Sequence, residues 1–175
     1  MSSMPVCEVR VATLSDAETL AAIHASAARA AYEGRVPEAS LAALGNADRV
    51  AHWRDAVNYG EPQVHVATLE GKVVGFVGFD RSRDKGTKPT VGEIWSIYVL
   101  PAHWDQGVGV ALWDAARDGL VEEGCTQVTS WLPLASDRAL RFMELAGFRR
   151  DMASARTVAV PGGRIDQLRL KRALG

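Results

Sequence analysis

The sequence has few cysteines and no excess of either charge: there are two Cys in 175 residues, and 20 Lys and Arg stand against 21 Asp and Glu. Cys7 and Cys125 lie far apart in apolar stretches, which is typical of small buried side chains and not of a disulfide scaffold. The net charge of -1 and the dispersed basic residues argue against nucleic-acid binding as the main activity. We therefore expect no nucleic-acid partner.

Signals for metal binding and for membranes are also missing. The four histidines show no HxxxH, CxxC or HxE spacing, so no zinc or iron site is expected. No apolar run approaches ~20 residues, and residues 1–6 lack the basic start and long apolar run of a signal peptide. These absences predict a cytoplasmic protein with no metal and no membrane partner.

What the sequence contains is typical of one ordinary domain. Hydrophobic residues make up 47% and charged residues 23%, close to the average of soluble globular proteins. A chain of 175 residues is long enough to bury roughly two thirds of the surface that its unfolded form exposes. No linker or internal repeat interrupts it, so we expect residues 1–175 to form a single domain with one core.

The hydrophobic pattern predicts a mixed α/β protein. Alternating apolar residues and turn signals predict strands at 6–12, 64–69, 73–79, 92–100 and 126–132, and a closing pair of strands after 148. Helical spacing and capping residues predict helices after 13–16, at 40–44, at 46–57, from about 107 to 124, and within 136–147. The order β-α-α-β-β-β-α-β-α-β-β predicts one mixed sheet of about seven strands flanked by about four helices.

The segment from Glu93 to Leu112, EIWSIYVLPAHWDQGVGVAL, carries the chemistry. A strand leads into a glycine turn at a helix start, where unpaired backbone N–H groups and the helix dipole suit a phosphate. A side chain at Gly107 or Gly109 would hold an anion away from this backbone. By itself a GxG turn is weak evidence, since it also serves to close a helix onto a sheet, and this one lacks the third glycine of a dinucleotide fingerprint.

In its order of elements and in two motifs, the whole chain resembles the GNAT acetyltransferase superfamily. The E-I-x-x-I-Y-V run, Pro101 and the GVG turn are similar to the family's motif A. SDRALRFMELAGF at 136–148 is similar to motif B, where N-x-x-A-x-x-x-Y-x-x-x-G-F is usual. AYEGRVP at 31–37, followed by Trp53, resembles a bacterial branch of small-molecule acetyltransferases. The resemblance implies a GNAT fold with a mostly antiparallel sheet.

The resemblance also implies where acetyl-CoA binds. It would lie between the strands at 92–99 and 126–132, with the pantetheine on the first strand's backbone and the pyrophosphate on the loop and helix start after it. The implied cofactor-binding residues are Ile97, Tyr98, Val99, Trp104, Asp105, Gln106, Gly107, Val108, Gly109, Val110, Ser136 and Met143.

Four of these positions depart from the family pattern. Trp104 and Asp105 replace the usual Arg or Gln and a common glycine, and an acid beside a diphosphate is unfavourable, so we expect Asp105 to point outward. In motif B the usual Asn is Ser136, and the usual Tyr, which protonates the departing thiolate, is Met143. Met cannot donate that proton. Tyr32 and Tyr98 are candidate replacements, unless they are merely packed aromatics.

Acyl transfer to an amine needs the amine in its neutral form, and hence a base. Glu93 is the first candidate, similar in position to the glutamate of the histone acetyltransferase branch, and strand alternation predicts that it shares a face with Trp95, Ile97 and Val99. The alternative is a strand-end glutamate in solvent. Glu33, on the loop after the first helix, is the second candidate, with a solvated turn residue as its alternative.

The acceptor pocket is expected among aromatic residues near these candidates. Tyr32, Glu33, Trp95 and Trp131 are the candidate substrate-binding residues, although large aromatics are often core residues.

Three functions remain open at this stage. The leading hypothesis is transfer of acetyl from acetyl-CoA to a primary amine on a small molecule, by direct attack in a ternary complex. The alternatives are acetylation of a protein N-terminus or lysine, and an acyl-CoA sensor with weak catalysis, which Ser136 and Met143 motivate. Family members often dimerise, and a closing hairpin with Val158, Val160, Ile165 and Leu168 would offer a strand edge for a homodimer.

Overall fold

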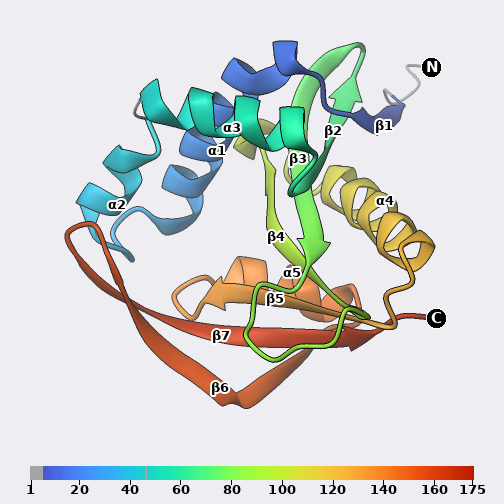
Figure 1. Ribbon diagram of the computed structural model, residues 1–175. Coiled ribbons are helices and arrows are strands. Elements are labelled where there is room, and N and C mark those ends of the chain that lie inside the picture. The colour runs from blue at the N-terminus through green and yellow to red at the C-terminus, as the bar shows by residue number, and fades with distance from the viewer. Residues whose placement is uncertain (1–5, 46) are drawn as a thin grey trace.

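A computed structural model describes residues 6–45 and 47–175. The described residues form seven strands and five α-helices (Figure 1). The strands are β1 (Cys7–Val11), β2 (Gln63–Leu69), β3 (Lys72–Arg81), β4 (Val91–Val99), β5 (Gln127–Pro133), β6 (Arg149–Val160) and β7 (Gly163–Ala173). The helices are α1 (Ala17–Tyr32), α2 (Glu38–Ala43), α3 (Ala47–Tyr59), α4 (Val108–Glu122) and α5 (Asp137–Leu145), with 3-10 turns η1 (Leu14–Asp16) and η2 (Pro101–His103).

The seven strands form one sheet in the order β1-β2-β3-β4-β5-β7-β6. Every neighbouring pair is antiparallel except β4 and β5, which run parallel. The predicted mixed, mostly antiparallel sheet of about seven strands is confirmed. The described residues form five α-helices where about four were predicted; three of them lie between β1 and β2, as the predicted segments had it, although the predicted order counted two there. The predicted start of the third helix at residue 46 lies outside the described residues.

A capping box at the 3-10 turn η1 leads into helix α1. The Thr13 backbone N–H donates to Asp16 Oδ2 at 2.8 Å, and the buried Asp16 carboxylate also accepts from Arg10 at 2.8 Å. A carboxylate at the start of a helix offsets its positive end. Leu20 and Ile23 then fall on the buried face, where they pack with Trp53 of α3.

Where one core was predicted, buried residues form two large clusters on opposite faces of the sheet and a smaller one around Tyr32 of α1 and Leu41 of α2. One large cluster contains Leu112 and Leu120 of α4 together with Leu140 and Met143 of α5. The other large cluster contains α1 and α3 with Phe76 of β3. Figure 1 shows α1 and α3 on one side of β3 and β4 and the long helix α4 on the other.

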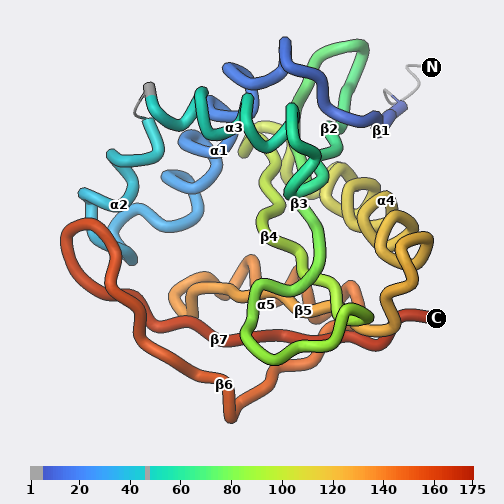
Figure 2. Tube along the Cα trace, in the orientation of Figure 1, coloured from blue at the N-terminus to red at the C-terminus, as the bar shows by residue number. Residues whose placement is uncertain are grey.

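The sheet opens between β4 and β5. Their pairing covers only Val91–Glu93 against Gln127–Thr129, and beyond it the strands diverge, as the trace in Figure 2 shows. A β-bulge near the end of this pairing leaves Trp95 without a partner on β3, since Ile94 pairs with Phe79 and Ser96 pairs with Gly78. We call the space where the strands separate the β4–β5 gap.

The closing hairpin reaches back to the first third of the chain. Its tip lies beside α2 (Figure 1), where the Ser40 hydroxyl donates to the Pro161 carbonyl at 2.6 Å. Arg35 donates to the Ala135 carbonyl at 3.1 Å, which ties the α1–α2 loop to the loop before α5. Among the described helices, none is both long and apolar enough to cross a membrane.

Candidate functional site

A cavity of about 680 Å³ opens at the β4–β5 gap. Its walls come from α1, β4, β5, the loop before α4, the start of α4, and α5. The divergence of β4 and β5 therefore creates the site. Beyond their short paired region, the backbone N–H and C=O groups that would otherwise bond to the neighbouring strand face the cavity.

The free edge of β4 faces this cavity. Leu100 N–H donates to Val74 of β3 at 2.9 Å, so by alternation the backbone groups of Val99 and Ile97 point to the opposite edge, into the gap. The Val99 carbonyl already accepts from Trp104 Nε1 at 2.8 Å. Ile97, Tyr98 and Val99 all line the cavity, which is where the resemblance placed the pantetheine site.

The start of α4 forms a second part of the wall. Gly107 is its N-cap with φ of 80°, a left-handed conformation that glycine adopts freely, and the first N–H groups of α4 have no partner within the helix. A Cβ at Gly109 would lie 3.0 Å from the Phe142 ring of α5. Gly109 is thus required for close packing of two helices, a reason that the sequence reading did not give.

The side chains around this turn are divided between the core and the surface. Gly107, Gly109 and Val110 line the cavity, Val108 is buried in the core, and Gln106 is exposed beside His103. Val108 and Gln106 can therefore contribute to the cavity only through their backbone.

The negative charge of the loop before α4 is paired with an arginine of α5. Asp105 has φ of 63°, and its side chain is 87% exposed and pairs with Arg138 of α5 at 3.0 Å. The same guanidinium lies 4.2 Å from the centre of the Trp104 ring. The Asp105 side chain is largely in solvent, as predicted, although the residue also forms part of the cavity wall, and Arg138 offsets its negative charge beside the helix start.

Motif B folds as the start of α5. The Ser136 hydroxyl is the N-cap and accepts from Ala139 N–H at 3.2 Å, so the Asn-to-Ser change keeps a cap. Met143 is 2% exposed and belongs to the core, although it also lines the cavity. Met143 therefore contributes an apolar thioether to the cavity wall, at the position where motif B usually has a tyrosine phenol.

Three hydroxyl groups meet across the cavity, from α1, β4 and the start of α5. Burial raises the pKa of the Tyr32 phenol, and hydrogen bonding with Ser136 and Tyr98 opposes that rise. Burial, with the neighbouring Tyr32 phenol, raises the pKa of Tyr98 far above its usual range. Both phenols therefore remain protonated near neutral pH and can donate a hydrogen bond.

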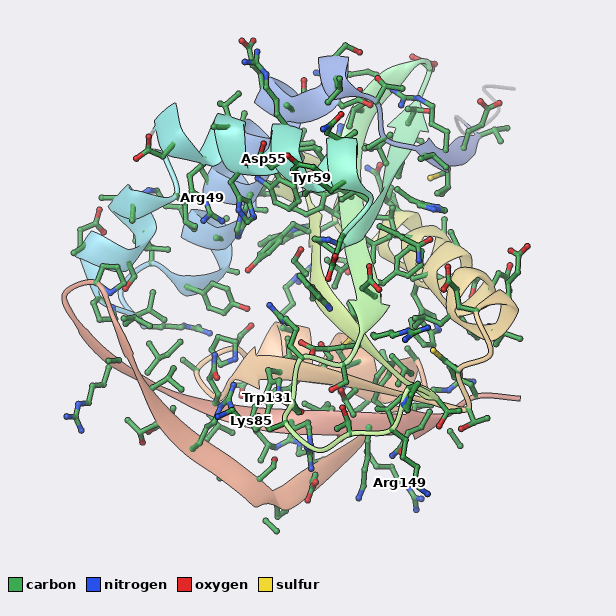
Figure 3. All side chains as sticks on the ribbon, in the orientation of Figure 1. Arg49, Asp55, Tyr59, Lys85, Trp131 and Arg149 are labelled. Carbon is green, nitrogen blue, oxygen red and sulfur yellow. The ribbon has the colours of Figure 1, made fainter. Side chains whose placement is uncertain are left out.

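Two tryptophans from neighbouring strands line the cavity beyond these hydroxyls. Trp95 donates through Nε1 to the Arg81 carbonyl at 3.3 Å, and Trp131 donates to Asp84 at 3.0 Å. In Figure 3, Trp131 lies at the loop that joins β3 to β4, next to Lys85 of that loop. The predicted aromatic residues Tyr32, Trp95 and Trp131 are thus brought into one cavity.

Glu93 is placed differently from the prediction. Ile94 packs into the α4 core with Ile97 and Val99, so its neighbour Glu93 points to the opposite face. The predicted shared face was wrong for Ile97 and Val99 because the bulge at Trp95 reverses the alternation, whereas the Arg83 guanidinium contacts both Glu93 and Trp95. The Glu93 carboxylate is 1% exposed, does not line the cavity, and accepts from the Arg83 backbone N–H at 2.9 Å.

Glu33 lies outside the cavity. Its side chain is 64% exposed at the end of α1 and pairs with Arg29 of the same helix at 3.3 Å. Both carboxylates that were predicted as bases are thus paired with arginines, and neither residue lines the cavity.

Sequence reasoning missed several residues of the wall. His24 of α1 lines the cavity with its ring 4.7 Å from that of Tyr98, and its Nδ1 is buried with no hydrogen-bond partner among the described residues. Burial, with the positive charges of Arg49 and His52, lowers its pKa to about 4. The basic residues Arg138 and Arg141 of α5 also line it, and their spacing of three within motif B was an available signal.

The arrangement suits an extended ligand that carries a phosphate at one end. Unpaired amides at the start of α4 and arginines of α5 suit the phosphate, the open edge of β4 suits amides, and buried phenols can donate protons beyond them. No group of three or more His, Cys, Asp or Glu side chains that could hold a metal ion occurs among residues 6–45 and 47–175.

Comparison with known proteins identifies the protein family to which the chain belongs. Residues 18–148 match the model of the Acetyltransferase (GNAT) family, and the chain belongs to that family. It is an acetyl-CoA-dependent acetyltransferase, which confirms the family and the cosubstrate predicted from motifs A and B.

Individual relatives agree with this assignment. An uncharacterized N-acetyltransferase of Bacillus subtilis, YuaI, is 31% identical over 127 residues, which are 71% of this chain and 70% of the relative. The PaiA N-acetyltransferase of Thermoplasma acidophilum, solved in complex with coenzyme A, is 13% identical with a TM-score of 0.78, over 96% of this chain and 99% of that one. YncA of Salmonella typhimurium, a putative acetyltransferase solved with acetyl-CoA, is 22% identical with a TM-score of 0.72, over 97% and 94%. At these identities the two structures show the shared fold.

Proposed function

We propose that the protein transfers acetyl from acetyl-CoA to a primary amine on a small molecule, by direct attack in a ternary complex. The observation that carries the proposal is the continuous cavity, which runs from the start of α4 to the tryptophans of β4 and β5. The Arg35–Ala135 and Ser40–Pro161 contacts tie the loops around it together. A walled cavity favours a small acceptor, whereas a peptide needs an open groove.

The fit to acetyl-CoA rests on this chain's own groups. Backbone groups of Ile97 and Val99 bind the pantetheine amides, and the N–H groups at the start of α4 bind the diphosphate with help from Arg138 and Arg141. That PaiA and YncA were solved with coenzyme A and acetyl-CoA supports this assignment.

The transfer is a single displacement at the thioester carbonyl. The amine lone pair forms the new C–N bond, the C–S bond breaks, the Tyr32 phenol supplies a proton to the departing thiolate, and the amine releases a proton to water. Water then returns a proton to the Tyr32 phenolate. Tyr32 takes the role that Met143 cannot fill, since its buried phenol is protonated and lines the cavity. Burial raises the pKa of both thiols, Cys7 and Cys125, and neither lines the cavity, which leaves no cysteine poised as a nucleophile in the described chain.

No carboxylate base is needed in this scheme if the amine binds in its neutral form. Glu93 as the base stays a prediction, and its carboxylate could receive the amine proton only through intervening groups, because it lies behind Arg83. Glu33 as a base also stays a prediction, with its side chain in solvent.

Calorimetric titration of acetyl-CoA, followed by a screen of primary amines for release of free CoA, tests the proposal. We expect saturable micromolar binding that is lost in Gly109→Val, because the new side chain would displace Phe142. Gly45→Ala, after α2, is the matched control, because its φ is not left-handed and its new Cβ would lie 3.6 Å from the Ala42 carbonyl oxygen, an ordinary contact distance. Preferred turnover of peptide N-termini or lysines over every small amine would contradict the small-molecule assignment.

A second candidate is an acyl-CoA sensor with weak catalysis. The buried Met143 in place of a phenol favours it. Tight acetyl-CoA binding without turnover of any amine would select the sensor.

The single-domain organisation, the cytoplasmic location and a homodimer stay predictions. In a homodimer, two chains would pair through β6, which carries Val158 and Val160 and is an edge strand of the sheet.

A further inference from the structure

The acceptor side of the cavity has an uncharged lining. The side chains contributed by α1, β4 and β5 are apolar, aromatic or hydroxylic, apart from His24, whose lowered pKa keeps it neutral near pH 7. The charged residues in the wall come from the loop before α4 and from α5: Asp105, Asp137, Arg138 and Arg141. A charged substituent on the acceptor would therefore lose water without gaining a partner of opposite charge from α1, β4 or β5.

An arginine guanidinium stacks on each of the two tryptophans, and neither arginine lines the cavity; each is therefore said to lie behind its ring. The Arg83 guanidinium lies 4.2 Å from the centre of the Trp95 ring, and that of Arg156 lies 3.6 Å from the centre of the Trp131 ring. Arg169 also lies 5.6 Å from Trp131. Each ring thus already holds a cation on one face.

The three arginines beside the tryptophans differ in whether an acidic side chain offsets their charge. Arg83 is paired with Glu93, and Arg169 with Asp84 and Asp151. For Arg156, the described residues provide a hydrogen bond to Gln167 at 3.2 Å but no ion pair within 4.0 Å. The charge behind Trp131 is therefore the less compensated of the two.

A second cation on the cavity face of Trp131 would be repelled. It would lie roughly 7 Å from the Arg156 guanidinium, where like charges near a protein surface lower binding on the order of tenfold. This repulsion opposes the attraction that the ring would otherwise offer to a cation. The same charge favours the neutral form of an amine over its ammonium form, and only the neutral form attacks a thioester.

We propose that the acceptor is a primary amine on an uncharged aromatic or apolar body, and that Trp95 and Trp131, each with an arginine behind it, exclude diamines, polyamines and lysine-rich peptides. This inference rests on the proposed function and names the substrate class of the same cavity. A carboxylate on the acceptor, as in a free amino acid, is disfavoured because the lining from α1, β4 and β5 offers it no cation.

Four amines of similar length test the charge dependence: 2-phenylethylamine, hexylamine, 1,5-diaminopentane and phenylalanine. With saturating acetyl-CoA, we expect kcat/KM for 2-phenylethylamine to exceed that for 1,5-diaminopentane and for phenylalanine by at least about tenfold, with hexylamine between them. A diamine or an amino acid that reacts as fast as 2-phenylethylamine would overturn the inference.

Arg156→Gln tests the role of the charge behind Trp131. This side chain is exposed on β6, so the fold should tolerate the change, and acetyl-CoA binding checks that it does. We expect the preference for 2-phenylethylamine over 1,5-diaminopentane to narrow at least threefold. Arg149→Gln is the matched control, because Arg149 is an exposed arginine of the same strand that Figure 3 shows at the far end of β6, away from Trp131.

The outcomes separate the two proposals. Turnover of amines with the charged ones preferred, or equal effects of Arg156→Gln and Arg149→Gln, would overturn the substrate class and leave the acetyltransferase assignment intact. Acetyl-CoA binding without turnover of any amine would instead reject small-molecule transfer, and the substrate class with it.

Discussion

Arg83 holds the carboxylate of Glu93 with its backbone and its side chain together. The backbone N–H donates to Oε1 at 2.9 Å and Nε donates to Oε2 at 3.2 Å, while the Glu93 side chain is 1% exposed. A buried carboxylate that accepts from three nitrogens of one residue, the backbone N, Nε and a terminal guanidinium nitrogen, anchors the loop that follows β3 near the start of β4. The same loop supplies Asp84 to Trp131, so this anchor also sets one wall of the acceptor side.

Glu93→Gln should therefore act mainly on stability. The amide keeps the volume but removes the charge opposite Arg83, and because Arg83 is half exposed we expect a loss of about 1 kcal/mol in the free energy of unfolding. Per folded enzyme, kcat should fall less than about tenfold and keep its pH profile. Denaturant unfolding and steady-state kinetics measure the two effects; loss of the acidic limb of the profile would instead identify Glu93 as the base.

Tyr32→Phe should lower kcat by about 10²-fold and leave acetyl-CoA affinity unchanged, because it removes the proposed proton donor but keeps the ring. An acyl donor with a more acidic thiol should recover most of the rate, since a better leaving group needs less protonation. Tyr98→Phe is the control, because Tyr98 is a neighbouring buried phenol with a still higher pKa. A larger loss in Tyr98→Phe than in Tyr32→Phe would reassign the donor.

His24 should make the protein less stable in mild acid. The unfolded chain binds a proton at this residue near pH 6.5, but the folded chain does so only near pH 4, because burial opposes the charge. The unfolded state thus binds more protons between these values. The contribution of His24 is complete above about pH 6.5 and falls, by at most about 3 kcal/mol, as the pH drops toward 4.

The comparison with His24→Phe isolates this contribution. The variant should show a flatter dependence of unfolding free energy on pH between 6.5 and 4, whatever its stability at pH 7. Other groups with lowered pKa values, such as His52 and His65, are shared by both proteins and cancel in the difference. Parallel curves for the two proteins would show that His24 is not held neutral.

Asp105→Gly should strengthen binding of acetyl-CoA about threefold at low salt, because it removes a negative charge beside the diphosphate site. Stability should stay within about 1 kcal/mol, since the relief of φ at 63° offsets the greater freedom of glycine in the unfolded chain. Calorimetry at low and high salt provides the test, with Asp114→Asn on the exposed side of α4 as the control. Weaker binding in Asp105→Gly would mean that Asp105 is needed to orient Arg138.

Local sequence predicted the parts of the site that lie within one segment. Alternation and the glycine turn identified β4, the loop and α4, and the motifs identified α5, because each of these depends on nearest neighbours along the chain. The prediction failed at Glu93, where a bulge of one residue reversed the faces of β4. The alternation of apolar and polar residues in the sequence does not indicate where a strand has such a bulge.

Contacts between distant segments were beyond the reach of pattern reading. Arg156 and Trp131 are brought together only when β6 joins the sheet beside β7, and His24 meets Tyr98 only when α1 packs on β4. The close approach of Gly109 to Phe142 likewise depends on two helices that are separate in sequence. These relationships are set by packing of the whole sheet and not by any local propensity.

The hydrogen bond between Ser40 and the Pro161 carbonyl has a consequence for biosynthesis. A ribosome releases α1 and α2 long before the hairpin that closes the acceptor side, and the core that holds α4 also waits for this hairpin, because it contains Leu170 of β7 beside Leu112. Completion of that side must await the last strand, β7, which also supplies the partner for β5. Acetyl-CoA binding and selectivity among amines should therefore arise together, once β7 has been synthesised.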